Sequence, residues 1–93
     1  MYATVRTYSA GPALADALVS NETDVKHLIR EIEGFKAYHL IRTAEGAVSI
    51  SIYETEAGAN ESTSAAAAFI RERMPEVAGS TPQVSSGEVV ISA

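Results

Sequence analysis

The sequence predicts one α+β domain in which strands and helices follow the order β-α-β-β-α-β. Three observations support this prediction: the chain has 93 residues, four of its segments have the composition or period of strands, and two have helical spacing of apolar residues. A chain of this length supports one hydrophobic core, because short chains bury too little surface for two. We therefore expect a single domain over residues 1–93.

The first strand is expected over residues 2–8, which are rich in β-branched and aromatic side chains and alternate between apolar and polar. Gly11 and Pro12 mark the turn that follows. Proline is tolerated at the first helical position, because its missing N–H would have no partner there. A helix should therefore begin near Pro12.

The first helix is expected to extend to Glu33, because its apolar residues recur at spacings of three, four and seven. Its polar stretch, residues 20–24, allows a kink or a restart, since short polar side chains compete for backbone hydrogen bonds. Gly34 can then take the left-handed conformation that ends a helix. The apolar stripe of this helix contains Leu14, Leu18, Val25, Leu28, Ile29 and Ile32.

Two strands follow over residues 35–43 and 47–54, joined by residues 44–46. A connection this short, with Gly46 late in it, makes a hairpin and forces the two strands to be antiparallel. In the second of them every other residue is apolar, so we expect its two faces to meet different environments.

Thr55 is a suitable cap for the second helix, which is expected to run to Met74, just before a proline. Its alanine block, residues 65–68, has high helix propensity and lets a helix lie close to a sheet. Residues 79–82 are expected to form a loop, and residues 84–92, with the run Val89-Val90-Ile91, a closing strand. The complete order is that of the ferredoxin-like fold, in which both helices cover one face of a four-stranded antiparallel sheet.

Composition excludes several classes of function. The formal net charge is −5 and the seven Lys and Arg residues are scattered, whereas nucleic-acid binding depends on clustered basic residues. The chain has no cysteine, and no apolar run approaches the roughly 20 residues of a membrane span. We therefore expect a cytoplasmic protein with no nucleic-acid partner, no membrane association and no thiolate chemistry.

Both helices are expected on the oily face of the sheet, which contains Val48, Ile50 and Ile52. The opposite face would mix aromatic and polar side chains, a composition that suits a concave pocket or a wet interface better than open water. A second copy of the chain is expected to cover it, which makes the protein a homodimer. This polar face would contain Tyr2, Thr4, Arg6, Tyr8, Tyr38, Leu40, Arg42, Ser49, Ser51 and Tyr53.

Four residues of that face are candidates for binding a small aromatic ligand: Arg6, Tyr38, Arg42 and Tyr53. A phenol can stack on a planar ligand and also donate a hydrogen bond. The alternative is that these side chains fill the dimer interface, where tyrosine and arginine are enriched for the same reasons.

His39 and Asn60 complete the candidates. By strand alternation His39 points toward the helices, and it has either a structural or edge role or a role in proton transfer. Asn60, early in the second helix, either aims its amide at the mouth of the pocket or is an ordinary exposed residue. His27 is expected at the surface, and two isolated histidines make a weak case for zinc, so we expect no metal site.

Two short motifs resemble a known family: Gly34-Phe35 at the start of the second strand, and Tyr53-Glu54-Thr55-Glu56-Ala57 where the third strand passes into the second helix. With the element order, they are similar to the dimeric α+β barrel superfamily and, within it, to the antibiotic-biosynthesis monooxygenase-like domains, which often read Gly-Phe and Trp-Glu-Ser-Glu there. The resemblance implies a homodimer whose sheets face each other, a last strand that reaches toward the partner, and a cavity in each protomer. Residues 56–63 look more like uncharacterised single-domain bacterial members than like the enzymes.

The resemblance also bears on activity. Some relatives oxidise polycyclic aromatics without metal or flavin, and others degrade haem. The helical histidine of the haem-degrading branch would fall near Thr63, and Tyr53 stands where tryptophan is usual, so no cofactor is expected.

Two functions stay open at this point. One is a small-molecule-binding homodimer that resembles the cofactor-free antibiotic-biosynthesis monooxygenases, with Tyr53, Arg42 and His39 placing or moving protons if it is an enzyme. The other is a non-catalytic structural or regulatory dimerisation module without a ligand. The sequence has no phosphate loop, nucleophile elbow or helical metal motif. No catalytic motif therefore favours one of these two functions over the other.

Overall fold

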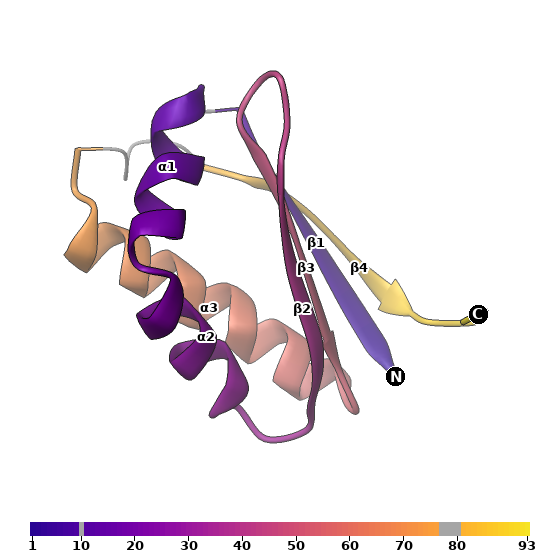
Figure 1. The fold of residues 1–93 in the computed structure, drawn as a ribbon. Coiled ribbons are helices and arrows are strands. Elements are labelled where there is room, and N and C mark those ends of the chain that lie inside the picture. Colours follow the sequence, from indigo (N-terminus) through magenta and orange to yellow (C-terminus); the bar gives the residue numbers. More distant parts are fainter. Residues whose placement is uncertain (10, 77–80) are drawn as a thin grey trace.

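The computed structural model describes residues 1–9, 11–76 and 81–93. Four strands form one antiparallel sheet in the order β2-β3-β1-β4, and the helices pack on one face of it (Figure 1). The structure confirms the predicted ferredoxin-like α+β fold, with the first helix divided in two. The strands are β1 (Tyr2–Tyr8), β2 (Phe35–Arg42), β3 (Ala47–Tyr53) and β4 (Gln83–Glu88), and the helices are α1 (Pro12–Ser20), α2 (Glu22–Arg30) and α3 (Glu56–Arg73).

Asn21 divides the first predicted helix. Its side-chain amide donates a hydrogen bond to the carbonyl of Ala17 at 2.9 Å, and its backbone N–H bonds the end of α1. A polar side chain that bonds the preceding turn ends one helix and lets the next begin. The restart allowed by the sequence is therefore confirmed. Gly34 has the expected positive φ of 84°, but it lies in the turn into β2, beyond the end of α2 at Arg30.

The start of α3 is held by a cap and by a close approach to the sheet. Thr55 accepts a hydrogen bond from the Gly58 N–H at 3.2 Å, as the sequence predicts for a cap. A Cβ at Gly58 would lie 3.1 Å from Cβ of Tyr53 and 3.0 Å from the carbonyl oxygen of Glu33. Glycine at this position therefore lets α3 lie directly against the end of β3. None of the described helices is both long enough and apolar enough to cross a membrane.

The last strand is shorter than predicted. β4 covers Gln83–Glu88, and its final residue pairs with Tyr2, where β1 begins. Beyond that point the Val89 N–H bonds the Met1 carbonyl at 2.8 Å, and residues 89–93 are not part of a strand. Val90 and Ile91 are 81% and 86% exposed, so the prediction of a strand to residue 92 was wrong. The loop predicted over residues 79–82 falls partly on residues 77–80, which lie outside the described part of the chain.

The two faces of the sheet are the reverse of the prediction. Directly paired residues of neighbouring strands share a face, and Arg6 pairs with Ser49, as Tyr2 pairs with Tyr53. Arg6 is 1% exposed and Tyr53 is fully buried, because this face lies under the helices. The uncovered side, here called the open face, carries the polar residues Thr7 and His39 and the apolar residues Ala3, Val5, Ala37, Ile41, Val48, Ile50 and Ile52. Alternation shows that two faces differ, but it does not show which of them the helices cover.

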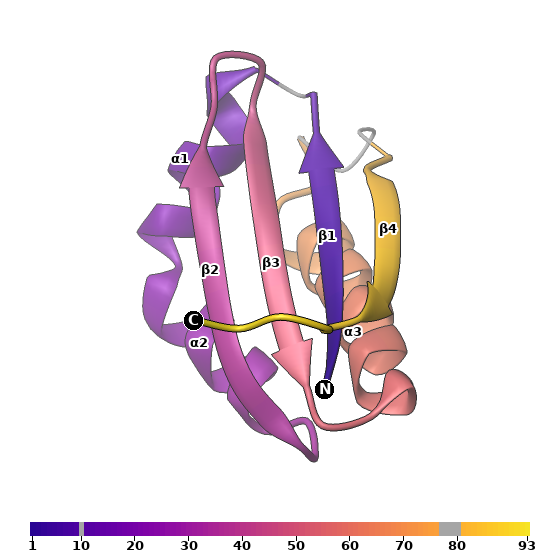
Figure 2. The same cartoon turned by 90° about the vertical axis from the view of Figure 1, so that its right-hand side faces the viewer.

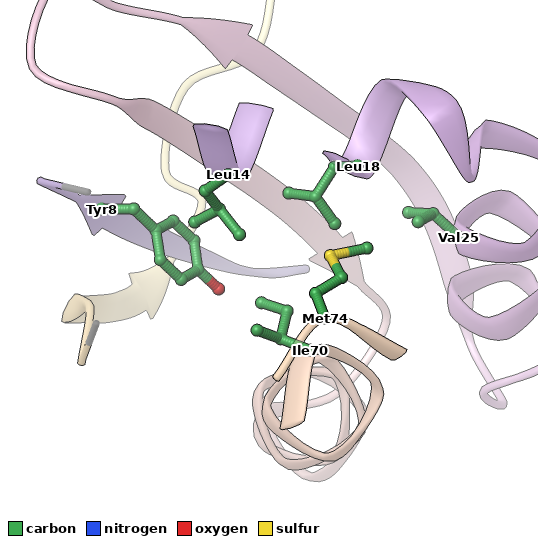
Figure 3. Packing of buried hydrophobic residues seen from close by; sticks show 6 residues of the cluster. All are labelled: Tyr8, Leu14, Leu18, Val25, Ile70 and Met74. Carbon is green, nitrogen blue, oxygen red and sulfur yellow. The ribbon is translucent and has the colours of Figure 1, made fainter. Parts of the chain in front are cut away.

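The hydrophobic core lies between the helices and the covered face. Figure 3 shows side chains from β1, α1, α2 and the end of α3 meeting in one cluster. That cluster consists of Tyr8, Leu14, Leu18, Val25, Ile70 and Met74. A second cluster consists of Ile29, Ile32, Tyr53 and Ala59. Two of the tyrosines predicted for the uncovered face, Tyr8 and Tyr53, are therefore part of the core, and the other two, Tyr2 and Tyr38, are half-buried against it.

Candidate functional site

Arg6 is the polar centre of the covered face. From β3, two serine hydroxyls accept its hydrogen bonds: Nε donates to Ser49 Oγ at 3.0 Å and Nη2 to Ser51 Oγ at 2.6 Å. From α3, Nη1 donates to Ser62 Oγ at 3.2 Å and to Thr63 Oγ1 at 3.0 Å. The guanidinium thus joins the sheet to α3 through four neutral hydroxyl groups.

The charge of Arg6 is not neutralised by a carboxylate among the described residues, since its four partners are hydroxyls. The residues outside the described ranges, 10 and 77–80, include no Asp or Glu. A buried charge without a counter-charge costs several kcal/mol. On the same face, the hydroxyl of Thr4 is buried without a hydrogen-bond partner in the described structure. Both features are unfavourable in a core that serves only packing, so they mark a candidate site.

Three tyrosines lie close enough to Arg6 for its charge to act on them. Burial raises the pKa of Tyr8 and of Tyr38, and it raises the pKa of Tyr53 to about 12, while Arg6 offsets part of each rise. All three phenols therefore stay protonated at neutral pH and are hydrogen-bond donors. They are not a counter-charge for Arg6.

The hydroxyls of these tyrosines have different surroundings. Tyr53 donates to the carbonyl oxygen of Ile29 at 2.7 Å, inside the core, and its ring packs edge-on against Phe35 with 5.9 Å between centroids. The hydroxyl of Tyr38 has no such partner among the described residues. Tyr53 is thus held in place by the fold, whereas Tyr38 is less constrained.

A groove of about 670 Å³ lies between the helices α1 and α2 and the edge strand β2. Pockets that hold small molecules are about 300–1,000 Å³ in volume and mostly apolar. The rim of this groove carries Glu22, Lys26 and Arg30. Its apolar and aromatic lining consists of Leu18, Val19, Val25, Ile29, Phe35, Tyr38, Leu40, Ile41 and Ile50.

A much smaller cavity of about 20 Å³ lies deeper, lined by Arg6, Tyr8 and Ser49 among others. It is about large enough for one water molecule. The residues that line both this inner cavity and the groove are Leu18, Val25, Ile29 and Tyr38. Their side chains form the wall between the groove and Arg6.

Three of the six predicted site residues lie at this region. Arg6 and Tyr38 line the inner cavity, and Tyr38 and His39 line the groove. The prediction that His39 points toward the helices was wrong: it pairs with Ile50 on the open face and is exposed. It reaches the groove only because β2 is the edge of the sheet.

The other three predicted residues do not line either cavity. Arg42 is exposed and pairs with Asp16 of α1 at 2.6 Å. Tyr53 is enclosed in the core, and Asn60 is exposed on α3. A direct role of these three in ligand binding stays a prediction.

Sequence reasoning missed the hydroxyls of α3 that bind Arg6. Ser62 and Thr63 lie 56 and 57 residues from Arg6 in the chain, and no local pattern joins them. One signal was present: Gly58, Ala59 and Ser62 form a stripe of small residues at helical spacing, and all three are buried. Such a stripe marks the side of a helix that lies close to another element.

Comparisons with known proteins agree with this architecture. Searches returned no matching protein-family model and no significantly similar curated protein. Among solved structures, the haem-degrader MhuD from Mycobacterium tuberculosis, with two haems in its active site, has a TM-score of 0.72 and 17% identity, and the match covers 100% of this chain and 99% of that one. Therefore the whole chain has a counterpart in a solved fold.

Two oxygenases match over nearly the same length. ActVA-Orf6 of Streptomyces coelicolor, a monooxygenase in complex with nanaomycin D, has a TM-score of 0.61 and 24% identity over 98% of this chain and 91% of that one. SnoaB, a cofactor-independent oxygenase from Streptomyces nogalater, has a TM-score of 0.61 and 14% identity over 98% and 92%. The chain has the antibiotic-biosynthesis monooxygenase-like fold. The monooxygenase-like fold confirms the resemblance seen in the sequence, and at these identities the likeness concerns the fold alone.

Proposed function

We propose that this protein is a homodimer that binds a small, largely apolar, planar molecule in the groove between α1–α2 and β2. The groove itself is the observation that carries the proposal, because its volume and apolar lining are those of a small-molecule pocket. Two proteins of the same fold were solved with ligands, nanaomycin D in one and haems in the other. Both ligands are planar, which supports a planar molecule as the ligand that we propose.

Apolar side chains at the mouth of the groove support binding further. Val19 and Ile41 are 53% and 46% exposed, one on the helix side and one on the strand side. A bound apolar ring would remove both from water, with a gain of about 25 cal/mol per Å² of apolar surface buried. An empty groove that resulted only from loose packing would lower the stability of the protein, and no ligand would compensate for the loss.

The helical position at which the haem-degrading branch has its histidine is not a histidine in this chain, and the histidine that lines the groove, His39, lies on β2 instead. Thr63, where the resemblance places the helical histidine of the haem-degrading branch, accepts a hydrogen bond from Arg6. His27 is exposed on α2 and lies 2.8 Å from Glu31. Across the part of the chain that the structure describes, no three His, Asp or Glu side chains gather to hold a metal ion. We therefore propose a ligand that needs no metal coordination by the protein.

The homodimer is proposed on the open face. This face is mostly apolar, with half-buried Val5 and Ile52 at its centre, and none of the described helices covers it (Figure 1). Ile41 and Ile50 of the same face lie toward the β2 edge, where they also line the groove. Figure 2 shows the segment after β4 running across the same side, and this segment carries the exposed Val90 and Ile91. An apolar sheet face on a soluble chain is normally packed against another layer. The interface that we propose therefore consists of oily residues rather than the Tyr, Arg and Ser set expected from the sequence.

The dimer is tested by placing a charge on the open face. Ile52→Glu should convert the dimer to a monomer in native mass spectrometry, because a carboxylate cannot be buried against an apolar face without a partner. Ala67→Glu, on an exposed position of α3, changes the net charge equally and should leave the dimer intact. A wild-type protein that is monomeric at all concentrations would contradict the proposed interface.

Ligand binding is tested with a reporter at the groove mouth. The chain has no tryptophan, so Val19→Trp introduces a single tryptophan beside the groove. Ala67→Trp introduces one at an exposed position of α3 that does not line the groove, and it is the control. Titration with methyl naphthoate, a neutral planar aromatic ester, should change the emission of Val19→Trp and leave that of Ala67→Trp unchanged. No response of Val19→Trp, together with an intact dimer, would favour the alternative of a dimerisation module without a ligand.

A further inference from the structure

We infer that the ligand is an organic anion whose carboxylate or enolate oxygen binds Arg6, with its planar apolar part in the groove. This inference rests on the proposed binding groove and names the chemical class of its ligand.

Arg6 is a full positive charge in the interior, 1% exposed, and each side chain that bonds it is a neutral hydroxyl. The nearby tyrosines are kept protonated by burial. An anion beside Arg6 would therefore supply the counter-charge that the described residues lack. In a low-dielectric interior such a pair is much stronger than at the surface.

The geometry around Arg6 also suits an oxyanion. A guanidinium has five N–H donors, and four of them bond the serine and threonine hydroxyls. A ligand oxygen would share the remaining N–H, on Nη2, with the neighbouring Tyr8 phenol. Ser49 and Ser51 accept from Arg6 through their oxygens, so each hydroxyl proton can still be donated to a ligand. Arg6 and these two serines together form a set of donors on the covered face, and Ser49 already lines the inner cavity.

Access to this set of donors leads through the wall that the groove shares with the inner cavity. Tyr38 belongs to that wall, and rotation of its side chain would break no hydrogen bond to a described residue. Leu18 and Val25 of the same wall project from α1 and α2 into the core cluster (Figure 3). We assign to Tyr38 the role of a gate between the groove and Arg6.

The rim of the groove adds to the attraction. The chain as a whole carries a net charge of −5, which disfavours the approach of an anion. The groove, however, has Lys26 and Arg30 at its rim beside one carboxylate, Glu22, which pairs with Lys26 at 2.6 Å. With Arg6 behind the wall, the local charge of this region is positive although the protein is acidic.

Two probes with the same rings test the inference: naphthoate, which is an anion, and methyl naphthoate, which is neutral. Isothermal titration calorimetry of the wild-type dimer should show naphthoate binding roughly tenfold to hundredfold more tightly, as expected for a hydrogen-bonded charge pair. Arg6→Met should abolish this preference while the ester still binds. The double variant Lys26→Met/Arg30→Met should keep most of the preference, because rim charges are screened by water and salt.

The outcomes separate the inference from the proposed function. If neither probe binds the wild-type protein, the proposed groove function fails and the inference fails with it. If both bind equally, or if the rim variant loses the preference and Arg6→Met keeps it, the inference is overturned and the groove function stands. Should Arg6→Met not fold, Ser49→Ala provides the second test: it retains the Arg6 charge and should weaken naphthoate severalfold without weakening the ester. Equal weakening of both probes would overturn the assigned oxyanion contact.

Discussion

Replacement of Tyr53 by phenylalanine isolates one buried hydrogen bond. The Tyr53 hydroxyl is fully buried and donates to the carbonyl oxygen of Ile29 at 2.7 Å. Ile29 is the penultimate residue of α2, so its carbonyl has no acceptor role within the helix, and Tyr53 is the group that satisfies it. Tyr53→Phe therefore leaves a buried carbonyl oxygen without a donor.

The expected cost is about 1–3 kcal/mol of unfolding free energy, the penalty for an unsatisfied buried polar group. For a domain of this size, each kcal/mol lowers the melting temperature by about 4–8 °C. Urea denaturation followed by circular dichroism measures the change directly. Tyr38→Phe is the matched control, because the Tyr38 hydroxyl has no hydrogen-bond partner among the described residues, and we expect a change of less than about 0.5 kcal/mol.

The Tyr53→Phe variant also tests whether Tyr53 has a structural role or contacts the ligand. Tyr53→Phe should leave the affinity for naphthoate within about twofold of wild type, since Tyr53 lines neither cavity. A Tyr53→Phe protein as stable as wild type would refute the assigned hydrogen bond. Loss of naphthoate binding at unchanged stability would show that Tyr53 contacts the ligand, as the sequence alone suggested.

Two further predictions concern close packing and pH. Gly58→Ala should destabilise the protein by about 1–3 kcal/mol, because its Cβ would meet Tyr53 and the Glu33 carbonyl at 3.0–3.2 Å and this overpacking outweighs the helix propensity of alanine. Ser64→Ala, at an exposed position of the same helix, is the control. Equal stabilities of Gly58→Ala and wild type in urea denaturation would contradict the close approach. The raised pKa of Tyr53, about 12 against 10.0 in an unfolded chain, means that the folded state keeps a proton that the unfolded state loses. The stability that this difference in pKa contributes is complete below about pH 10 and is lost as the pH rises to about 12. Urea denaturation should therefore show that the unfolding free energy of the wild type falls in that window and that of Tyr53→Phe falls less. Parallel curves for the two proteins would exclude Tyr53 as the group responsible.

Much of the fold was predictable because its signals are local. Pro12 is suited to the first position of a helix because its ring leaves it without a backbone N–H. The polar side chain of Asn21 interrupts the helix, and Thr55 caps the helix that follows it. Each of these features depends on neighbours within a few residues. The strand order then follows from the short hairpin and the split βαβ pattern.

The faces of the sheet and the site were not predictable in the same way. Polar residues usually face water, so Arg6, Ser49 and Ser51 were expected on the side away from the helices. Their burial becomes favourable only when β1, β3 and α3 come together and the hydroxyls reach the guanidinium. That arrangement depends on contacts between residues 43–57 positions apart in the chain, and the periodicity of a single segment does not predict such contacts. The end of β4 was overestimated for a related reason, since the length of a strand depends on its pairing with a neighbour and not on its own composition alone.

The central claim is that a ligand binds on the covered side of the sheet, beside Arg6, while the open face holds the partner. Amide chemical-shift mapping by NMR during titration of the wild-type protein with naphthoate tests this claim most directly. We expect the largest shifts at Arg6, Leu18, Val25 and Tyr38, with those at Val5 and Ile52 nearly unchanged. Shifts concentrated at Val5 and Ile52 would instead place the ligand on the open face and contradict both parts of the claim.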